Sequence, residues 1–346
     1  MMGHRSMNAN RPALLAAVLI GALLFSGCVH LPASRFNRAT PAPLPAWATN
    51  SLAGSGTLAF KTHEKELEAR RGCTIKQVEL AVESNPAGSP TVLEYYQLTR
   101  GTNPVILLLP VSGGGYQIER FFARYFARHG FAVLIVHRAK IARELNEIAT
   151  INDWMKQRMV DLRQVIDWVE TRPELDAGRI GVFGISMGGI QGTILTAVDE
   201  RVRAAVLGLA GEDLPYILTH STEKGIVRRR EAYLRERQLP LERVEEELRQ
   251  TVVWDPKTLA PCIDPQRALL VLGVCDTTVP FKKGWALRKS IGRPETILLP
   301  TGHYTALLCI PYIERRGRKF FQARFDTERQ DGLPRPTLAS PKAKAR

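Results

Sequence analysis

The sequence of 346 residues is poor in the residue types that build metal centres and cross-linked scaffolds, with five cysteines and seven histidines. The cysteines form no paired CxxC motif and the histidines form no cluster, so we expect no metal site and no bound cofactor. Aromatic residues make up 7% of the chain. Because no zinc-finger, helix-turn-helix or aromatic RNA-binding motif accompanies the basic residues, the net charge of +14 does not indicate a nucleic-acid partner.

The composition, 45% hydrophobic and 24% charged, excludes a multi-spanning membrane protein. An N-terminal apolar run, Ala13 to Phe25, has 13 residues, fewer than the roughly 20 that span a bilayer. It follows a positively charged start with Arg5 and Arg11, which is the pattern of an export signal. The run ends in Leu24-Phe25-Ser26-Gly27-Cys28, which resembles the lipobox of bacterial lipoproteins. The resemblance implies a signal peptide over residues 1–27 and lipid attachment at Cys28.

The residue after the cysteine bears on the destination of such a lipoprotein. Val29 stands where aspartate would retain a Gram-negative relative in the inner membrane, so the resemblance implies an outer-membrane lipid anchor facing the periplasm. An ordinary cleaved signal and an uncleaved anchor, each with an incidental cysteine, are the alternatives. An oxidising compartment allows zero, one or two disulfides among the other cysteines, which are Cys73, Cys262, Cys275 and Cys309.

Composition divides the rest of the chain into three parts. Residues 28–56 carry prolines at positions 32, 41, 43 and 45, which oppose regular structure and predict a tether between membrane and domain. Residues 57–331 carry the periodic apolar pattern of a folded domain. Residues 332–346 hold three prolines and several basic residues without periodic apolar positions, and predict a disordered basic tail.

The central part alternates strands and helices. Two segments of alternating apolar and polar residues, 74–82 and 91–98, flank a turn at 85–88 and predict an antiparallel pair at a sheet edge. Apolar residues at helical spacing predict a helix over Trp154 to Val169. Continuous apolar strands, typical of a buried parallel sheet, are predicted at 105–109, 132–136, 180–183, 204–209, 269–274 and 296–299. The pattern predicts an α/β doubly wound fold.

A stretch of about fifty residues, 212–261, interrupts this alternation. It is rich in Arg and Glu, and it carries one apolar helical face made of Leu241, Val244, Leu248 and Val252. We predict a helical insertion between late strands. It is either a solvated surface element or a lid over the site, since long insertions in compact domains are often functional.

The sequence Gly184-Ile185-Ser186-Met187-Gly188 directly follows a predicted strand and precedes an apolar helix over residues 189–198. A sharp turn between strand and helix needs small residues around the serine, because larger side chains would collide with the neighbouring backbone. The turn presents Ser186 at the carboxyl edge of the sheet, beside the free amide groups of a helix N-terminus. Ser186 is therefore the candidate nucleophile.

A serine hydroxyl needs a base that takes its proton and an acid that orients this base. Among the seven histidines, His303 follows the serine and comes just after a strand end. Asp276 follows the predicted strand 269–274 and completes the order Ser, Asp, His that this motif uses. The rival acids are Glu212 and Asp213, just past the preceding strand.

Backbone N–H groups are expected to stabilise the oxyanion that forms when the serine attacks. One belongs to Met187, the residue after the nucleophile. The other is expected in the glycine-rich loop 110–115, where Gly113 and Gly114 are the leading candidates. This loop lacks the Lys-Ser/Thr pair of a phosphate-binding loop and the GxGxxG of a dinucleotide site.

These motifs resemble the α/β-hydrolase superfamily, in particular its dienelactone hydrolase and prolyl oligopeptidase-like esterase branch. The resemblance covers residues 73 to 313 and rests on the loop 111–115, the run 167–189, Asp276 and His303. It implies the α/β-hydrolase fold and hydrolysis through an acyl-enzyme. Ser112 stands where many relatives carry a histidine, and a serine nucleophile favours a general esterase over a dienelactone hydrolase in the strict sense.

The sequence thus predicts a serine hydrolase that acts on a small-molecule ester or related acyl substrate and meets the membrane through its lipid anchor. A peptidase of prolyl oligopeptidase-like type and an acyltransferase are alternatives, because both use the same acyl-enzyme. A catalytically silent binding lipoprotein with the same fold is an alternative of a different class.

Overall fold

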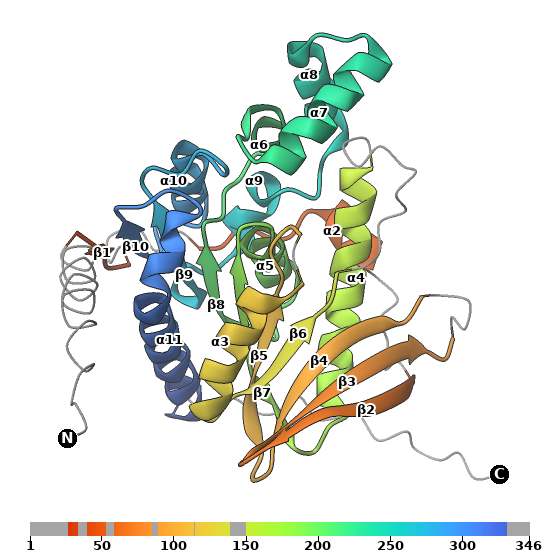
Figure 1. Ribbon diagram of the computed structural model, residues 1–346, viewed down its shortest axis with the longest axis vertical. Coiled ribbons are helices and arrows are strands. Elements are labelled where there is room, and N and C mark those ends of the chain that lie inside the picture. The colour runs from red at the N-terminus through yellow and green to blue at the C-terminus, as the bar shows by residue number, and fades with distance from the viewer. Residues whose placement is uncertain are drawn as a thin grey trace, which may run out of the picture.

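The computed structural model describes residues 27–33, 40–52, 59–84, 89–113, 115–138 and 150–330. The expected signal segment before residue 27, the turn at 85–88, Gly114 and the tail 332–346 lie outside the described residues. Figure 1 shows a central sheet with helices on both faces and a group of helices beyond one end of its strands. The elements therefore stack as helix, sheet and helix layers.

Within the described residues, ten strands form one sheet in the order β1-β10-β9-β8-β7-β5-β6-β4-β3-β2. The six strands from β10 to β6 run parallel, whereas β1 at one edge and β4, β3 and β2 at the other pair antiparallel. The bounds are β1 (Val29–Leu31), β2 (Phe60–Arg70), β3 (Cys73–Val82), β4 (Thr91–Leu98), β5 (Asn103–Leu109), β6 (Ala132–Val136), β7 (Leu175–Ile185), β8 (Val202–Gly208), β9 (Ala268–Gly273) and β10 (Glu295–Leu299). The predicted α/β fold with a mostly parallel sheet is confirmed.

The edge of the sheet differs from the prediction. The predicted antiparallel pair forms as β3 and β4, but the strand β2 covers β3 and is the true edge. β2 has the sequence FKTHEKELEAR, with seven charged or histidine side chains and little burial. Charged residues on an edge strand discourage pairing with another chain, and they also mask the apolar alternation by which a strand is recognised.

Part of the segment expected to be a tether is ordered against the domain. Val29–Leu31 pairs with β10, and the helix α2 (Ala46–Leu52) buries Ala48 and Leu52 in the core. Trp47 packs edge-on against Trp254, with ring centroids 5.2 Å apart. The expectation of a stretch without regular structure is wrong for these residues, because β1 ends before Pro32 and α2 begins after Pro45, so that no proline interrupts either element.

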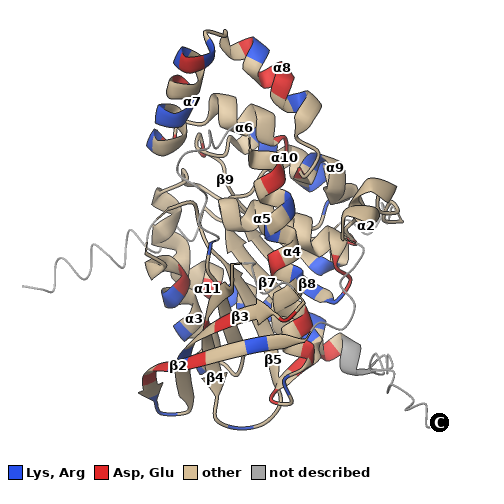
Figure 2. Ribbon diagram, turned by 90° about the vertical axis from the view of Figure 1, so that its right-hand side faces the viewer, with Lys and Arg blue, Asp and Glu red and all other residues tan. Residues whose placement is uncertain are grey.

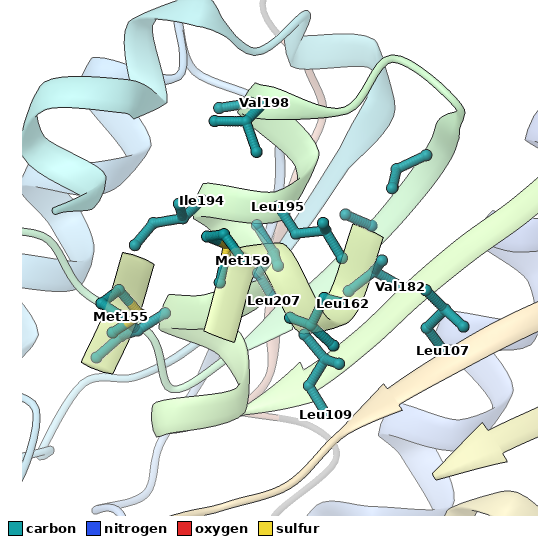
Figure 3. Packing of buried hydrophobic residues seen from close by; sticks show 14 of the residues in the cluster. Leu107, Leu109, Met155, Met159, Leu162, Val182, Ile194, Leu195, Val198 and Leu207 are labelled. Atoms are coloured by element: carbon teal, nitrogen blue, oxygen red, sulfur yellow. The ribbon is translucent and has the colours of Figure 1, made fainter. Parts of the chain in front are cut away.

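The two faces of the sheet bury separate cores, as strand geometry requires. Along β5, Leu107 and Leu109 face one core, and Ile106 and Leu108 face the other. Figure 3 shows the first core, in which strand residues meet helices α4 and α5. The second core lies under α3 and α11. The helices on the two faces are α3 (Gln117–Arg128), α4 (Ile151–Glu170), α5 (Met187–Val198), α10 (Phe281–Ser290) and α11 (Ile310–Gln330).

The insertion between β8 and β9 is helical, as predicted, and lies beyond the carboxyl ends of the parallel strands (Figure 1). Val244 and Leu248 of the predicted apolar face are buried, as is Val252. Helix α7 contributes one buried residue, Tyr233. The helices of the insertion are α6 (Leu214–His220), α7 (Lys224–Arg237), α8 (Leu241–Thr251) and α9 (Pro256–Leu259). Among the helices that the structure describes, none has the length and apolar character needed to cross a membrane.

All five cysteines are described and none forms a disulfide, which is one of the three states that the sequence allowed. Two of the thiols nevertheless meet. The half-buried Cys28 hydrogen-bonds with Cys309, the buried last residue of the 3-10 helix η3 (Thr305–Cys309). Burial raises the pKa of both thiols, that of Cys309 to about 11, so both are protonated near neutral pH.

Candidate active site

Ser186 lies in a sharp turn between β7 and α5, with a backbone φ of 58° and ψ of −122°. A positive φ is strained for a residue with a side chain and costs on the order of 1–3 kcal/mol. Glycines make the turn possible, because a Cβ atom on Gly184 would lie 2.2 Å from the Gly188 carbonyl oxygen. The Ser186 N–H donates to the Gly208 carbonyl oxygen at 2.8 Å, which ties the turn to β8.

His303 and Asp276 meet Ser186 at the carboxyl edge of the sheet. The Nε2 atom of His303 lies 3.0 Å from the Ser186 Oγ atom, and its Nδ1 atom lies 2.7 Å from Asp276 Oδ2. The Asp276 carboxylate is buried, and its other oxygen accepts from the N–H groups of Thr278 and Val279 at 2.9 and 3.0 Å. The three predicted side chains thus form one hydrogen-bonded chain that runs from hydroxyl to imidazole to carboxylate.

The rival acids have other partners than His303. Asp213 accepts from Arg249 Nη1 at 2.7 Å and from Lys283 Nζ at 2.5 Å. Burial raises the pKa of Asp213, but these two cations lower it below its ordinary value. The carboxylate is therefore ionised and paired with Arg249 and Lys283. Glu212 is buried, and burial raises its pKa. Among the described residues, neither carboxylate contacts His303.

Met187 is the first residue of α5, so its N–H has no acceptor within the helix and lies directly beside Ser186. In the glycine-rich loop, Gly113 is exposed and has a φ of 91°, a conformation that glycine adopts without strain. Gly114, the other predicted donor, lies outside the described residues. Val111 and Ser112 line the same cavity as Ser186, which brings the loop to the nucleophile.

Polar side chains that sequence analysis missed hold this loop. The buried Glu119 accepts from the Val111 N–H at 2.8 Å, so this N–H is not available to a substrate. Arg138 donates to the carbonyl oxygens of Val111 and Gly113, the latter at 2.6 Å. Because a trans peptide directs C=O and the next N–H to opposite sides, the Ser112 N–H points away from the Arg138 guanidinium. Ser112 is therefore a further candidate oxyanion donor.

A second layer of polar contacts supports the same loop from β4 and β6. The buried Glu94 accepts three hydrogen bonds from Arg120, the shortest at 2.6 Å, and one from His137 at 3.2 Å. Arg120 also donates to the Gly115 carbonyl oxygen at 3.0 Å. The His137 ring stacks on Tyr116 with 4.2 Å between ring centroids. Burial raises the pKa of Glu94, but His137 and Arg120 lower it to about 2.

A cavity of about 150 Å³ opens at Ser186 and His303. One wall comes from the strand ends and α11, including Phe183, Val206 and Ile313, and the facing wall comes from the insertion. Among the described residues that line the cavity, only Glu223 has a carboxylate, and that carboxylate already accepts from the Ile226 N–H at 2.7 Å. The other lining side chains contributed by the insertion are Leu214, Ile217, Leu218 and Ile226. The cavity therefore suits an uncharged, apolar group.

In the described ranges, no cluster of three or more His, Cys, Asp or Glu side chains could hold a metal ion. The arrangement that is present needs only a nucleophile, a base, an acid and backbone donors. Sequence order located the first three. The supporting residues Glu119, Arg138 and Glu94 carried no signal in the sequence, because they reach the loop through contacts between distant segments.

Comparisons with known proteins bear on this site. The family model described as X-Pro dipeptidyl-peptidase (S15 family) matches residues 59–251. An uncharacterized protein of Mycobacterium tuberculosis, recorded in two strains, is 25% identical over 180 residues. The match covers 51% of this chain and 38% of the relative, so this chain spans well under half the length of its matched curated relatives.

Solved structures give the same fold at low sequence identity. An acetyl xylan esterase from Paenibacillus sp. R4 superposes with a TM-score of 0.60 at 21% identity, covering 78% of this chain and 93% of that one. Acetyl xylan esterase 1 from Thermoanaerobacterium sp. JW/SL YS485 gives 0.57 at 19% identity, covering 81% and 96%. Both are similar to this chain in α/β-hydrolase architecture.

Proposed function

This chain belongs to the S15 family of α/β hydrolases and is a hydrolase by that membership; within this class, we propose that it is a serine carboxylic-ester hydrolase. One observation carries the proposal, namely the hydrogen-bonded chain from Ser186 Oγ through His303 to Asp276. A hydroxyl positioned on an imidazole, which is itself positioned on a buried carboxylate, is the arrangement that makes serine nucleophilic at neutral pH.

In the proposed reaction, Ser186 Oγ attacks the ester carbonyl carbon while its proton passes to His303 Nε2. Asp276 holds the imidazole through Nδ1 and stabilises the imidazolium that forms. The oxyanion accepts from the Met187 N–H and from an N–H of the loop after β5, each worth about 3–4 kcal/mol of barrier in comparable enzymes. The intermediate collapses to an acyl-enzyme as the alcohol leaves with the proton from His303. Water then repeats the sequence and releases the acid.

The lining of the cavity favours esters over peptides with a free amino end. A protonated amine buried in the cavity would need an anionic partner, and the carboxylate that the described lining offers, on Glu223, caps helix α7. An apolar acyl group needs no such partner. The family description names a peptidase, so release of X-Pro dipeptides is the second candidate. Acyl transfer to an alcohol or sugar would use the same acyl-enzyme.

A fluorophosphonate probe tests the proposal, because it reacts with an activated serine whatever the natural substrate. We expect the full chain to be labelled and to hydrolyse p-nitrophenyl esters, and Ser186→Ala to do neither. Asp213→Asn is the matched control, because it removes a rival carboxylate outside the triad. A folded wild-type chain that is neither labelled nor active on any ester would overturn the proposal. Faster cleavage of aminoacyl-prolyl anilides than of esters would favour the peptidase.

We further propose that the chain is exported and anchored in the bacterial outer membrane by lipid on Cys28, facing the periplasm. The lipobox-like sequence before Cys28 and the apolar run before it support this. Labelling of expressing bacteria with a radioactive fatty acid tests it. The label should enter the wild-type chain and not Cys28→Ala, while Cys262→Ala should be labelled normally. If the wild-type chain is exported but takes up no fatty acid, the segment is an ordinary signal peptide and the proposed lipid anchor is wrong.

A further inference from the structure

The 3-10 helix η3, which follows the proposed catalytic base directly, exposes large apolar side chains. Tyr304 is 62% exposed, Leu307 48% and Leu308 61%; we call these three residues the η3 patch. Residues three apart in a 3-10 helix lie on one side, so Tyr304 and Leu307 form a continuous surface. Grouped apolar side chains on a protein surface mark interaction sites more often than single ones do.

The η3 patch is continuous with the cavity at Ser186. Tyr304 and Leu307 are exposed and also line that cavity, so one apolar surface leads from solvent to the nucleophile. Leu218 and Ile226 of the insertion form the opposite wall. An acyl chain could therefore pass from an apolar phase outside the protein to the reacting carbonyl without crossing water.

The N-terminal strand brings the proposed lipid attachment site to the same place. Val29 of β1 pairs with Leu298 of β10, so Cys28 lies at the end of β10 that leads into His303. The Cys28 side chain hydrogen-bonds with Cys309, the residue directly after Leu308 in the chain. A lipid on Cys28 would hold the η3 patch close to the membrane.

Helix α7 supplies charge of the sign that a bacterial membrane surface attracts. It begins directly after Glu223, which lines the cavity, and its sequence KGIVRRREAYLRER holds six basic and two acidic residues. Figure 2 shows these charges along α7, beyond the carboxyl ends of the strands. Basic segments at a surface are drawn to anionic lipids, and their attraction adds to that of buried apolar side chains.

We infer that the mouth of this site docks on a membrane surface and takes lipid-borne esters whose apolar acyl chain enters across the η3 patch. The inference rests on the proposed ester hydrolase function and names the phase from which its substrate comes. Burial of Leu307 and Leu308 in the lipid layer provides affinity, and α7 selects anionic surfaces. The η3 patch should not change the rate of hydrolysis of short, water-soluble esters, because their acyl chains cannot reach from the lipid layer into the cavity.

The experiment compares two leucine substitutions of equal chemistry. Leu308→Glu introduces a charge into the η3 patch, and Leu67→Glu introduces the same charge on the edge strand β2, where Leu67 is 47% exposed. Each full chain is assayed on a fluorogenic long-chain ester in phosphatidylethanolamine vesicles containing phosphatidylglycerol, and on p-nitrophenyl acetate in solution. The measured quantity is the ratio of the two rates, together with cosedimentation with the vesicles.

We expect Leu308→Glu to lower the ratio of vesicle to soluble rate by about tenfold or more, because burying one leucine and excluding one charge from the layer is worth at least that factor. Leu67→Glu should keep the wild-type ratio and the wild-type cosedimentation. Equal ratios for the two variants would overturn the inference, as would a wild-type rate on vesicles no higher than in solution. Absence of hydrolysis and of fluorophosphonate labelling would instead contradict the proposed function itself.

Discussion

The two sides of the candidate active site are built in different ways. On the side of the nucleophile, β7 passes into α5 through a turn whose glycines contact backbone atoms, and every α5 residue from Gly188 to Val198 is buried. On the side of the base, β10 leads to His303 and then to η3, whose two leucines, Leu307 and Leu308, are exposed. Backbone sterics position Ser186, whereas side-chain hydrogen bonds position His303.

This difference determines which kind of substitution should damage each side. A methyl group is enough to disrupt the nucleophile side, because its close contacts involve backbone that cannot move away. Helix α11 on the side of the base should accept the same change, whereas His303 itself should be sensitive to changes in hydrogen bonding or charge. Five substitutions, two of them controls, break or sharpen this comparison.

The largest effect is expected from Gly188→Ala on the side of the nucleophile. A Cβ atom at this position would lie 2.1 Å from the Leu109 carbonyl oxygen. We expect the variant to lose at least about 4 kcal/mol of unfolding free energy or to fail to fold, as overpacking against backbone does. Urea unfolding followed by circular dichroism measures the loss.

Gly317→Ala in α11 is the matched control on the side of the base. The nearest heavy atom to a Cβ there is Phe183 Cε2 at 3.7 Å, an ordinary contact. Alanine favours helix over glycine, so the stability should rise by up to about 1 kcal/mol. Similar losses for both glycine variants would contradict the proposed contrast between the two sides.

The next effect concerns the hydrogen bond that positions the base. Asp276→Asn keeps the shape of the acid but replaces the oxygen that accepts from His303 Nδ1 by a group that can also donate. The imidazole is then held in the wrong tautomer, and kcat for ester hydrolysis should fall by about 10³–10⁴-fold. The unfolding transition should change little. A wild-type kcat in this variant would remove Asp276 from the proposed triad.

The smallest effect is a pH dependence of the free energy of unfolding, which comes from the helix that follows η3. Glu314 of α11 is buried, its Oε1 atom has no hydrogen-bond partner in the described structure, and burial raises its pKa to about 7. The folded chain then holds a proton that the unfolded chain releases near pH 4.5, the ordinary value. Folding stability from this group is therefore present at low pH and lost as pH rises to about 7.

Glu314→Gln should remove the loss of folding stability that accompanies the rise in pH. Its melting temperature should exceed that of wild type by about 2–4 °C at pH 8 and match it at pH 4, as measured by differential scanning calorimetry. Glu245→Gln is a control of opposite sign: burial raises the pKa of Glu245, but hydrogen bonds from Arg249 and Thr219 lower it below its ordinary value. That variant should lose stability at pH 8. An unchanged melting temperature for Glu314→Gln at both pH values would show that folding does not raise the pKa of the Glu314 carboxyl group.

Local sequence was sufficient wherever the signal lies within a few adjacent residues. The turn around Ser186 could be predicted because its small residues stand next to a strand and a helix. The prediction that Asp276 and His303 approach Ser186 needed only chain order and strand ends. By contrast, β2 was missed because charged residues on both faces of an edge strand hide its alternation. The strand and helix within the expected tether were missed because both are short and they flank a segment rich in proline.

The order of apolar strands and the small residues around Ser186 decided by themselves that this chain forms a parallel sheet with a serine at its carboxyl edge. Burial of apolar strands and the steric needs of one turn are local demands, so adjacent residues express them. Only the tertiary structure decided that Glu119 and Arg138 hold the glycine-rich loop, that the insertion and α11 line an apolar cavity, and that Cys28 lies beside η3. Those are contacts between segments far apart in the chain, and they exist only after the sheet has brought its two edges and its loops together.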